Sequence, residues 1–128
     1  MQLLLDTHLL LWSMAASRRL PAEARELLTD TENAVFFSAA SIWEIAIKSA
    51  LSKRDFKVDL PGMLRALPRA GFSELPVSAA HAAAVAALPA HHKDPFDRLL
   101  VAQAIRGPLI LLTNDSQLLA YGSPVRLV

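Results

Sequence analysis

The amino-terminal stretch MQLLLDTHLLLW, residues 1–12, places an acid where an apolar run gives way to a helical pattern. Residues 2–6 form a short apolar run that ends on Asp6, and residues 7–15 are typical of a helix whose leucines and tryptophan supply bulk for burial. A strand followed at once by a helix is the repeating unit of α/β folds. The pattern therefore predicts that Asp6 lies at the carboxyl end of a first strand.

The same alternation continues along the chain. Strand-like apolar runs cover 34–37, 72–77, 109–113 and 125–128. Helical patterns cover 22–28, 38–51, 61–71, 78–88, 94–106 and the residues before Gly122, and the polar stretch 52–59 is typical of an exposed connection. Strands separated by helices imply a largely parallel sheet with helices on both faces, so we expect one α/β domain over residues 1–128.

The composition limits the possible metal ligands and the cellular location of the protein. The hydrophobic fraction is 53%, but charges interrupt every apolar stretch well before the roughly 18 residues that a membrane-spanning helix needs. The sequence therefore indicates no membrane association and favours a cytoplasmic location. Because the chain has no cysteine, any metal site must use oxygen or imidazole ligands. The net charge of +1 gives no global attraction to nucleic acid, so a phosphate-binding surface would be local.

Acidic side chains recur at corresponding places in separate elements. Asp6, Glu44, Asp97 and Asp115 each fall where a strand gives way to a helix, or in the opening turns of a helix. In an open α/β sheet such junctions lie at the carboxyl edge, where ligands bind. Carboxylates brought together there would raise one another's pKa unless a hard cation lay between them. The set therefore predicts a Mg²⁺ or Mn²⁺ site.

Each acid also has a purely structural explanation. Asp6 and Asp115 could cap the helices that follow them, and Asp97 in the first turn of a helix would be stabilised by the positive end of the helix dipole. Glu44 completes a capping-box pattern that begins at Ser41. Asp94 precedes a proline and is favoured as a helix cap over a metal ligand. The metal site is therefore argued from the set of acids and not from any single member.

Other polar side chains could support these acids. Thr7, Ser38, Thr113 and Asn114 are candidate donors that would orient the carboxylates. His8 is expected to pack or to face solvent. The adjacent pair His91 and His92 is interpreted as part of a loop, since neighbouring histidines lack the i, i+4 spacing that aims two rings at one ion.

Basic and aromatic residues near the acids have either a binding role or a structural one. Lys48 and Arg98 are candidate contacts for an RNA backbone, although a salt bridge to a neighbouring acid would equally explain Arg98. The basic segment from 48 to 69 could be a nucleic-acid surface or an ordinary solvated one. Trp12 and Trp43 are expected to anchor the core.

Taken together, these motifs resemble those of PIN-domain ribonucleases and, more narrowly, of the VapC toxins of type II toxin–antitoxin pairs. The resemblance spans essentially the whole chain and rests on LLLDTH (3–8), SIWEIAIK (41–48), HKDPFDRLLVAQA (92–104) and LLTNDSQL (111–118). The most specific of these motifs is HKDPFDRLLVAQA. It implies that the family's catalytic, metal-binding acids fall on Asp6, Glu44, Asp97 and Asp115, with Asp94 as an accessory acid. It further implies a Mg²⁺- or Mn²⁺-dependent endoribonuclease, a homodimer, and a cognate antitoxin whose carboxyl-terminal segment occupies the active-site groove.

The chemistry of the residues supports part of this implication. Carboxylates that hold Mg²⁺ can present an activated water to a phosphodiester and stabilise the leaving oxygen, with Asp6 and Asp97 as the best direct ligands. One alternative is a catalytically inactive PIN module that binds RNA or an antitoxin. A receiver-like phosphoacceptor domain is disfavoured because no lysine follows Lys93. A haloacid-dehalogenase-like phosphatase is disfavoured because His8 stands where that class needs its second aspartate.

Overall fold

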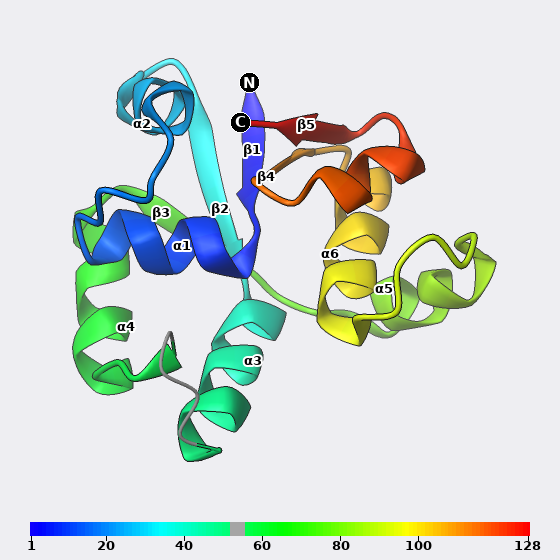
Figure 1. Cartoon of the computed structure of the whole chain (residues 1–128), viewed down its shortest axis with the longest axis horizontal. Helices are drawn as coiled ribbons and strands as arrows, with labels where there is room; N and C mark the ends of the chain where they lie inside the picture. The colour runs from blue at the N-terminus through cyan, green and yellow to red at the C-terminus, as the bar shows by residue number, and fades with distance from the viewer. Residues whose placement is uncertain (52–55) are drawn as a thin grey trace.

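A parallel sheet forms the centre of the molecule in the computed structural model, which describes residues 1–51 and 56–128 (Figure 1). Within that part of the chain the sheet has five strands in the order β3-β2-β1-β4-β5, and every neighbouring pair is parallel. The strands are β1 (Gln2–Leu5), β2 (Ala34–Ser38), β3 (Phe72–Leu75), β4 (Ile110–Thr113) and β5 (Val125–Leu127). The predicted α/β class and parallel sheet are confirmed.

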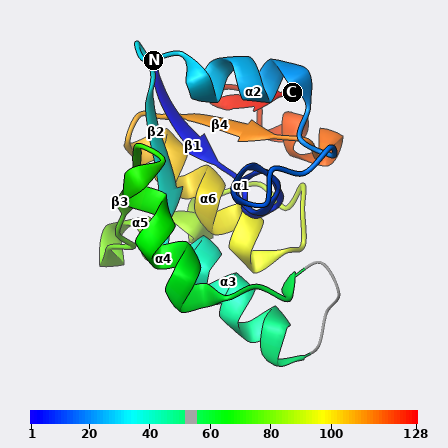
Figure 2. The same cartoon turned by 90° about the vertical axis from the view of Figure 1, so that its left-hand side faces the viewer.

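Helices cover both faces of this sheet. They are α1 (Thr7–Met14), α2 (Ala22–Thr29), α3 (Ala39–Ala50), α4 (Leu60–Arg69), α5 (Ala79–Ala84) and α6 (Pro95–Arg106), with 3₁₀ turns η2 (Val85–Ala87) and η3 (Ser116–Tyr121). In Figure 1, α1, α2 and α4 lie on one side of the sheet and α5 and α6 on the other. Helix α3 extends beyond the carboxyl end of β2, at the opposite end of the molecule from α2 (Figure 2).

The apolar strand sequences are explained by burial on both faces. Leu3 and Leu5 belong to one core cluster and Leu4 to the other, and none of the three side chains is exposed. Successive side chains of a strand point to opposite faces, so a strand covered on both sides must be apolar at every position. Strand β4 divides in the same way, with Leu112 in the first cluster and Leu111 in the second.

The order of the strands creates a crevice beside β1. The chain steps outward from β1 to β2 and β3, and then returns to place β4 on the other side of β1. The connections that leave β1 and β4 therefore diverge at the carboxyl edge, which is where open α/β sheets bind ligands. Asp6 directly follows β1, and its backbone N–H donates to the Leu112 carbonyl of β4 at 3.0 Å. Asp115 follows β4 by two residues, on the other wall of this crevice.

The structure differs from the sequence-based prediction in a few places. The third strand ends at Leu75, because Pro76 has no N–H to continue the ladder. The connection expected to be exposed over 52–59 includes residues 52–55, which lie outside the described residues, and Phe56, which is buried in the core cluster and contacts the ring of His8 on α1. Within the described ranges, no helix combines the length and apolarity needed to cross a membrane.

Candidate metal centre

Asp6 is held rigidly at the end of β1. Its carboxylate caps α1, with Oδ1 accepting the Leu9 N–H at 2.8 Å, and Oδ2 accepts the Thr113 hydroxyl of β4 at 2.6 Å. The Thr113 oxygen also accepts the Asp115 N–H at 3.0 Å. One threonine therefore links two of the predicted acids, and the predicted role of Thr113 as a supporting donor agrees with this geometry.

Glu44 reaches the same edge from α3. Ser38 caps this helix by accepting the Ala40 N–H, so the capping box predicted from Ser41 to Glu44 is wrong, and the Glu44 carboxylate is available for other partners. The Thr7 hydroxyl donates to Glu44 Oε1 at 2.6 Å, while Lys48, one turn further along α3, forms an ion pair with Oε2. Glu44 is only 3% exposed, so these partners stabilise a charge that is almost removed from water.

The first turn of α6 contributes two acids with different surroundings. Asp94 caps the helix, because its Oδ1 accepts the N–H groups of Phe96 at 2.8 Å and Asp97 at 3.1 Å. Asp97 lies further into the centre. Among residues 1–51 and 56–128, no hydrogen-bond donor contacts its carboxylate, and the nearest cationic or imidazole nitrogen is His92 Nε2 at 3.7 Å. Asp97 is therefore the acid of this group that lacks a compensating partner.

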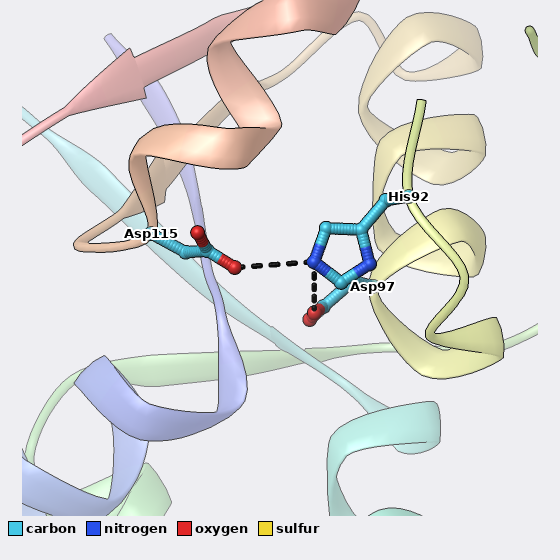
Figure 3. Close-up of side chains that lie close together, drawn as sticks. All are labelled: His92, Asp97 and Asp115. Atoms are coloured by element: carbon cyan, nitrogen blue, oxygen red, sulfur yellow. Dashed lines mark hydrogen bonds and ion pairs between the residues drawn. The ribbon is translucent and has the colours of Figure 1, made fainter. Parts of the chain in front are cut away.

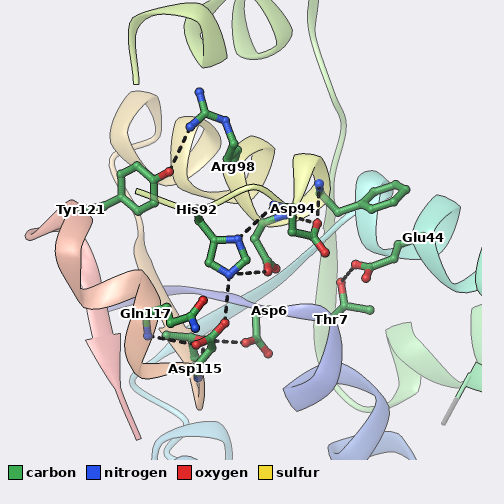
Figure 4. A network of polar contacts seen from close by, with 12 residues as sticks. Asp6, Thr7, Glu44, His92, Asp94, Arg98, Asp115, Gln117 and Tyr121 are labelled. Carbon is green, nitrogen blue, oxygen red and sulfur yellow. Dashed lines mark hydrogen bonds and ion pairs between the residues drawn. The ribbon is translucent and has the colours of Figure 1, made fainter. Parts of the chain in front are cut away.

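Asp115 is the last of the acids, and it approaches the others from the carboxyl end of β4. Its Oδ1 accepts the Gln117 N–H at 2.9 Å and caps η3, and its Oδ2 lies 3.2 Å from His92 Nε2 (Figure 3). Oxygen and nitrogen atoms of His92, Asp97 and Asp115 lie within 4.8 Å of one another. Figure 4 shows how side chains from separate parts of the chain converge here.

The convergence of the acids affects the pKa of Asp97. Burial, followed by the negative charges of Asp94, Asp6, Glu44 and Asp115, raises the pKa of Asp97 to about 8. Burial also raises the pKa of Asp6, although its hydrogen bonds from Thr113 and Leu9 act in the opposite direction. The carboxylates are therefore close enough to oppose one another's ionisation, and a cation between them would relieve that repulsion.

Comparison with known proteins identifies the family. The PIN domain family model matches residues 3–123, which is nearly the whole chain. The chain belongs to the PIN-domain family. A comparison with curated protein sequences gave no significant match. The resemblance to PIN domains that the sequence motifs indicated is thus confirmed.

Solved structures with the same fold include chains of toxin–antitoxin complexes. VapBC2 from Rickettsia felis, bound to a DNA fragment from its promoter, matches with a TM-score of 0.69 and 16% identity over 100% of this chain and 98% of that chain. A toxin–antitoxin complex from Klebsiella pneumoniae matches with a TM-score of 0.65 and 22% identity over 96% and 94%. VapBC-5 from Mycobacterium tuberculosis matches with a TM-score of 0.63 and 19% identity over 99% and 97%. At these identities the matches establish a shared fold for this PIN domain.

Three residues predicted to serve the site are engaged elsewhere in the PIN domain. The Ser38 hydroxyl donates to Gln103 Oε1 at 2.6 Å, and the Asn114 amide donates to the Val128 carbonyl at 2.9 Å. Arg98 donates to the carbonyls of Pro89 and Val85 and to the Tyr121 hydroxyl at 2.9–3.1 Å, so its guanidinium ties the loop before α6 to η2 and η3. This geometry argues against the phosphate contact predicted for Arg98 and equally against a salt bridge to a neighbouring acid.

Other residues lie differently from what the sequence suggested. His92 lies in the loop before α6, as predicted, but the sequence did not indicate that its ring lies between two of the acids of the PIN domain. Arg19, which the sequence did not single out, lines a surface hollow together with Asp6, Asn114 and Asp115. Trp43 is 61% exposed and touches Phe96 edge to face, so its predicted role as a core anchor is wrong.

Proposed function

We propose that this PIN domain is a metal-dependent endoribonuclease that hydrolyses RNA phosphodiester bonds as the toxin of a toxin–antitoxin pair. The observation that carries the proposal is the convergence of Asp6, Glu44, Asp97 and Asp115 at the carboxyl edge of the sheet in a chain of this family. The Asp97 carboxylate faces the other acids without a donor of its own in the described part of the chain. A divalent cation would balance the charge of these carboxylates.

The donor set suits a hard ion. All of these acids offer carboxylate oxygens, which Mg²⁺ and Mn²⁺ prefer over softer ligands. We assign Asp6 and Asp97 as direct ligands, and Glu44 and Asp115 as residues that complete the site directly or through bound water. When bound, such an ion would supply positive charge at the scissile phosphate and lower the pKa of a coordinated water.

The chain's own residues would keep these ligands in place. Thr113 and Thr7 each donate a hydrogen bond of 2.6 Å to an acid, which restricts the rotation of Asp6 and Glu44. Lys48 is paired with Glu44 and lies 4.0 Å from Asp94, so we assign it chiefly to balancing acidic charge. Arg19 lines the hollow beside Asp6, and we assign it to binding the RNA backbone in place of Arg98.

The partners follow from the same proposal. Chains of this fold occur in toxin–antitoxin complexes from R. felis and K. pneumoniae, which supports a cognate antitoxin as the inhibitor of this protein. We further propose that it acts as a homodimer. Size-exclusion chromatography with light scattering would distinguish a dimer from the 13.9 kDa monomer.

Cleavage assays test the proposed activity. Purified protein is incubated with a labelled RNA that carries single-stranded loops and with a fully paired RNA, in Mg²⁺, in Mn²⁺ and in EDTA. We expect cleavage that requires a metal and is lost in Asp6→Asn and Asp97→Asn. Asp30→Asn is the matched control, because this exposed acid lies in the turn after α2 and asparagine can still accept its hydrogen bond from the Glu32 N–H.

The outcomes separate the proposal from its alternative. Cleavage that persists in EDTA or in both centre variants would show that these acids do not hold a catalytic ion. RNA binding without cleavage, by a protein that binds Mn²⁺, would instead identify an inactive RNA-binding module.

A further inference from the structure

The His92 ring is fixed at both of its nitrogens. Its Nδ1 accepts the Asp94 backbone N–H at 3.0 Å, and its Nε2 lies 3.2 Å from Asp115 Oδ2 and 3.7 Å from Asp97 Oδ2. Its side chain is only 12% exposed. Figure 3 shows the ring with its Nε2 edge directed at both carboxylates. A loop residue without a role at the site would not need to be held in this orientation.

The first of these contacts determines where the ring carries its proton. A backbone N–H can only donate, so Nδ1 must offer its lone pair to Asp94 and carry no hydrogen. A neutral imidazole then has its hydrogen on Nε2. Nε2 therefore donates to Asp115 Oδ2 and has no lone pair for a metal. Although His92 lies within reach of a shared ion, in this orientation it is a donor to a ligand and not itself a ligand.

Asp115 is the acid whose orientation depends on His92. Its side chain is 40% exposed, whereas Asp6 and Glu44 are almost fully buried. The Gln117 N–H holds one Asp115 oxygen, and His92 is the side chain that holds the other. Without His92, the second oxygen could turn toward solvent and away from Asp97.

We infer that His92 is a positioning residue that holds Asp115 in the orientation required to share a divalent ion with Asp97. This inference rests on the proposed function, because it assigns a role toward the ion of that site. Hydrogen-bond donors to metal ligands commonly change metal affinity by about 10–100-fold. His92 should therefore contribute to metal affinity without providing a ligand atom.

Metal binding provides a test that does not depend on catalysis. Mn²⁺ affinity is measured by titration calorimetry for the wild type, His92→Leu, His92→Gln and the neighbouring control His91→Leu, together with melting temperatures in EDTA. We expect His92→Leu to weaken Mn²⁺ binding about tenfold or more. His92→Gln should recover the affinity to within about threefold, because its amide N–H₂ can donate to Asp115. His91, which packs against Tyr121, should have no effect on affinity.

The results distinguish this inference from the proposed function. Wild-type affinity in His92→Leu would refute the positioning role and leave the nuclease proposal intact. Loss of binding in both His92 variants, as complete as in Asp97→Asn, would make His92 a ligand and would also refute it. If the wild type itself binds no Mn²⁺, the proposed metal site and the inference fail together.

Discussion

Replacing Asp97 by asparagine is expected to stabilise the metal-free protein. The native carboxyl has a pKa of about 8 against a usual value of 3.8, so between these values the native state holds a proton that the unfolded state releases. At pH 7 the solution lies about 3 pH units above the unfolded pKa, and each unit is worth about 1.4 kcal/mol, so the native state is destabilised by about 4 kcal/mol. Asparagine removes this ionisation from both states, and it loses no charge–dipole stabilisation, because the native carboxyl of Asp97 is mostly protonated at pH 7.

The gain of about 4 kcal/mol should raise the melting temperature in EDTA by roughly 15 °C for a domain of this size. Because the native pKa is the higher one, the penalty is absent below about pH 4, grows as the pH rises and is complete above about pH 8. The difference between the variant and the wild type should therefore shrink when melts at pH 8 are repeated at pH 5.

Added Mg²⁺ should stabilise the wild type more than Asp97→Asn, because the variant lacks one of the two proposed direct ligands. Asp30→Asn, with the same chemical change at an exposed site, should melt like the wild type at every pH. If Asp97→Asn is no more stable than the wild type in EDTA, or if its advantage does not depend on pH, then burial and the neighbouring carboxylates do not raise the pKa of Asp97 as described.

Further predictions concern the neighbours of the acids. Thr113→Val should lower stability by about 2–3 kcal/mol in urea unfolding, because it leaves Asp6 Oδ2 without its donor; an unchanged midpoint would contradict that bond. Arg98→Leu should destabilise by about 2–4 kcal/mol without weakening RNA binding by the folded protein, and Arg98→Lys should not rescue it, since one ammonium cannot replace the planar fork. Trp43→Ala should cost about 1 kcal/mol or less, and a loss above about 3 kcal/mol would show that this side chain is buried.

Local signals in the sequence predicted the framework of the site well. The apolar run before Asp6 and the Asp-Pro pair at Asp94 are short patterns whose meaning depends on adjacent residues, and the structure has a strand end and a helix cap at these positions. The parallel pairing of the strands followed from alternating strands and helices, because parallel strands need crossover connections, whereas the order of the strands around β1 came only from the structure.

The features that the sequence did not reveal depend on contacts between distant segments. His92 meets Asp115 across 23 residues, so no local spacing could indicate their contact. Trp43 has an apolar side chain in a helical pattern, but α3 extends past the edge of the sheet, and part of its surface has no layer to cover it. The bonds of Arg98 to the Val85 carbonyl and the Tyr121 hydroxyl likewise depend on how η2 and η3 pack around α6.

The position of β4 in the sheet also affects when the centre can form during synthesis. Asp6 emerges from the ribosome well before the threonine that fixes its carboxylate, which lies 107 residues later. Until β4 is made, one edge of β1 has no partner, and Asp115 has not yet been added. The growing chain therefore carries an incomplete set of acids until β4 and the residues just after it have been made. The complete group of acids can form only after that point of synthesis.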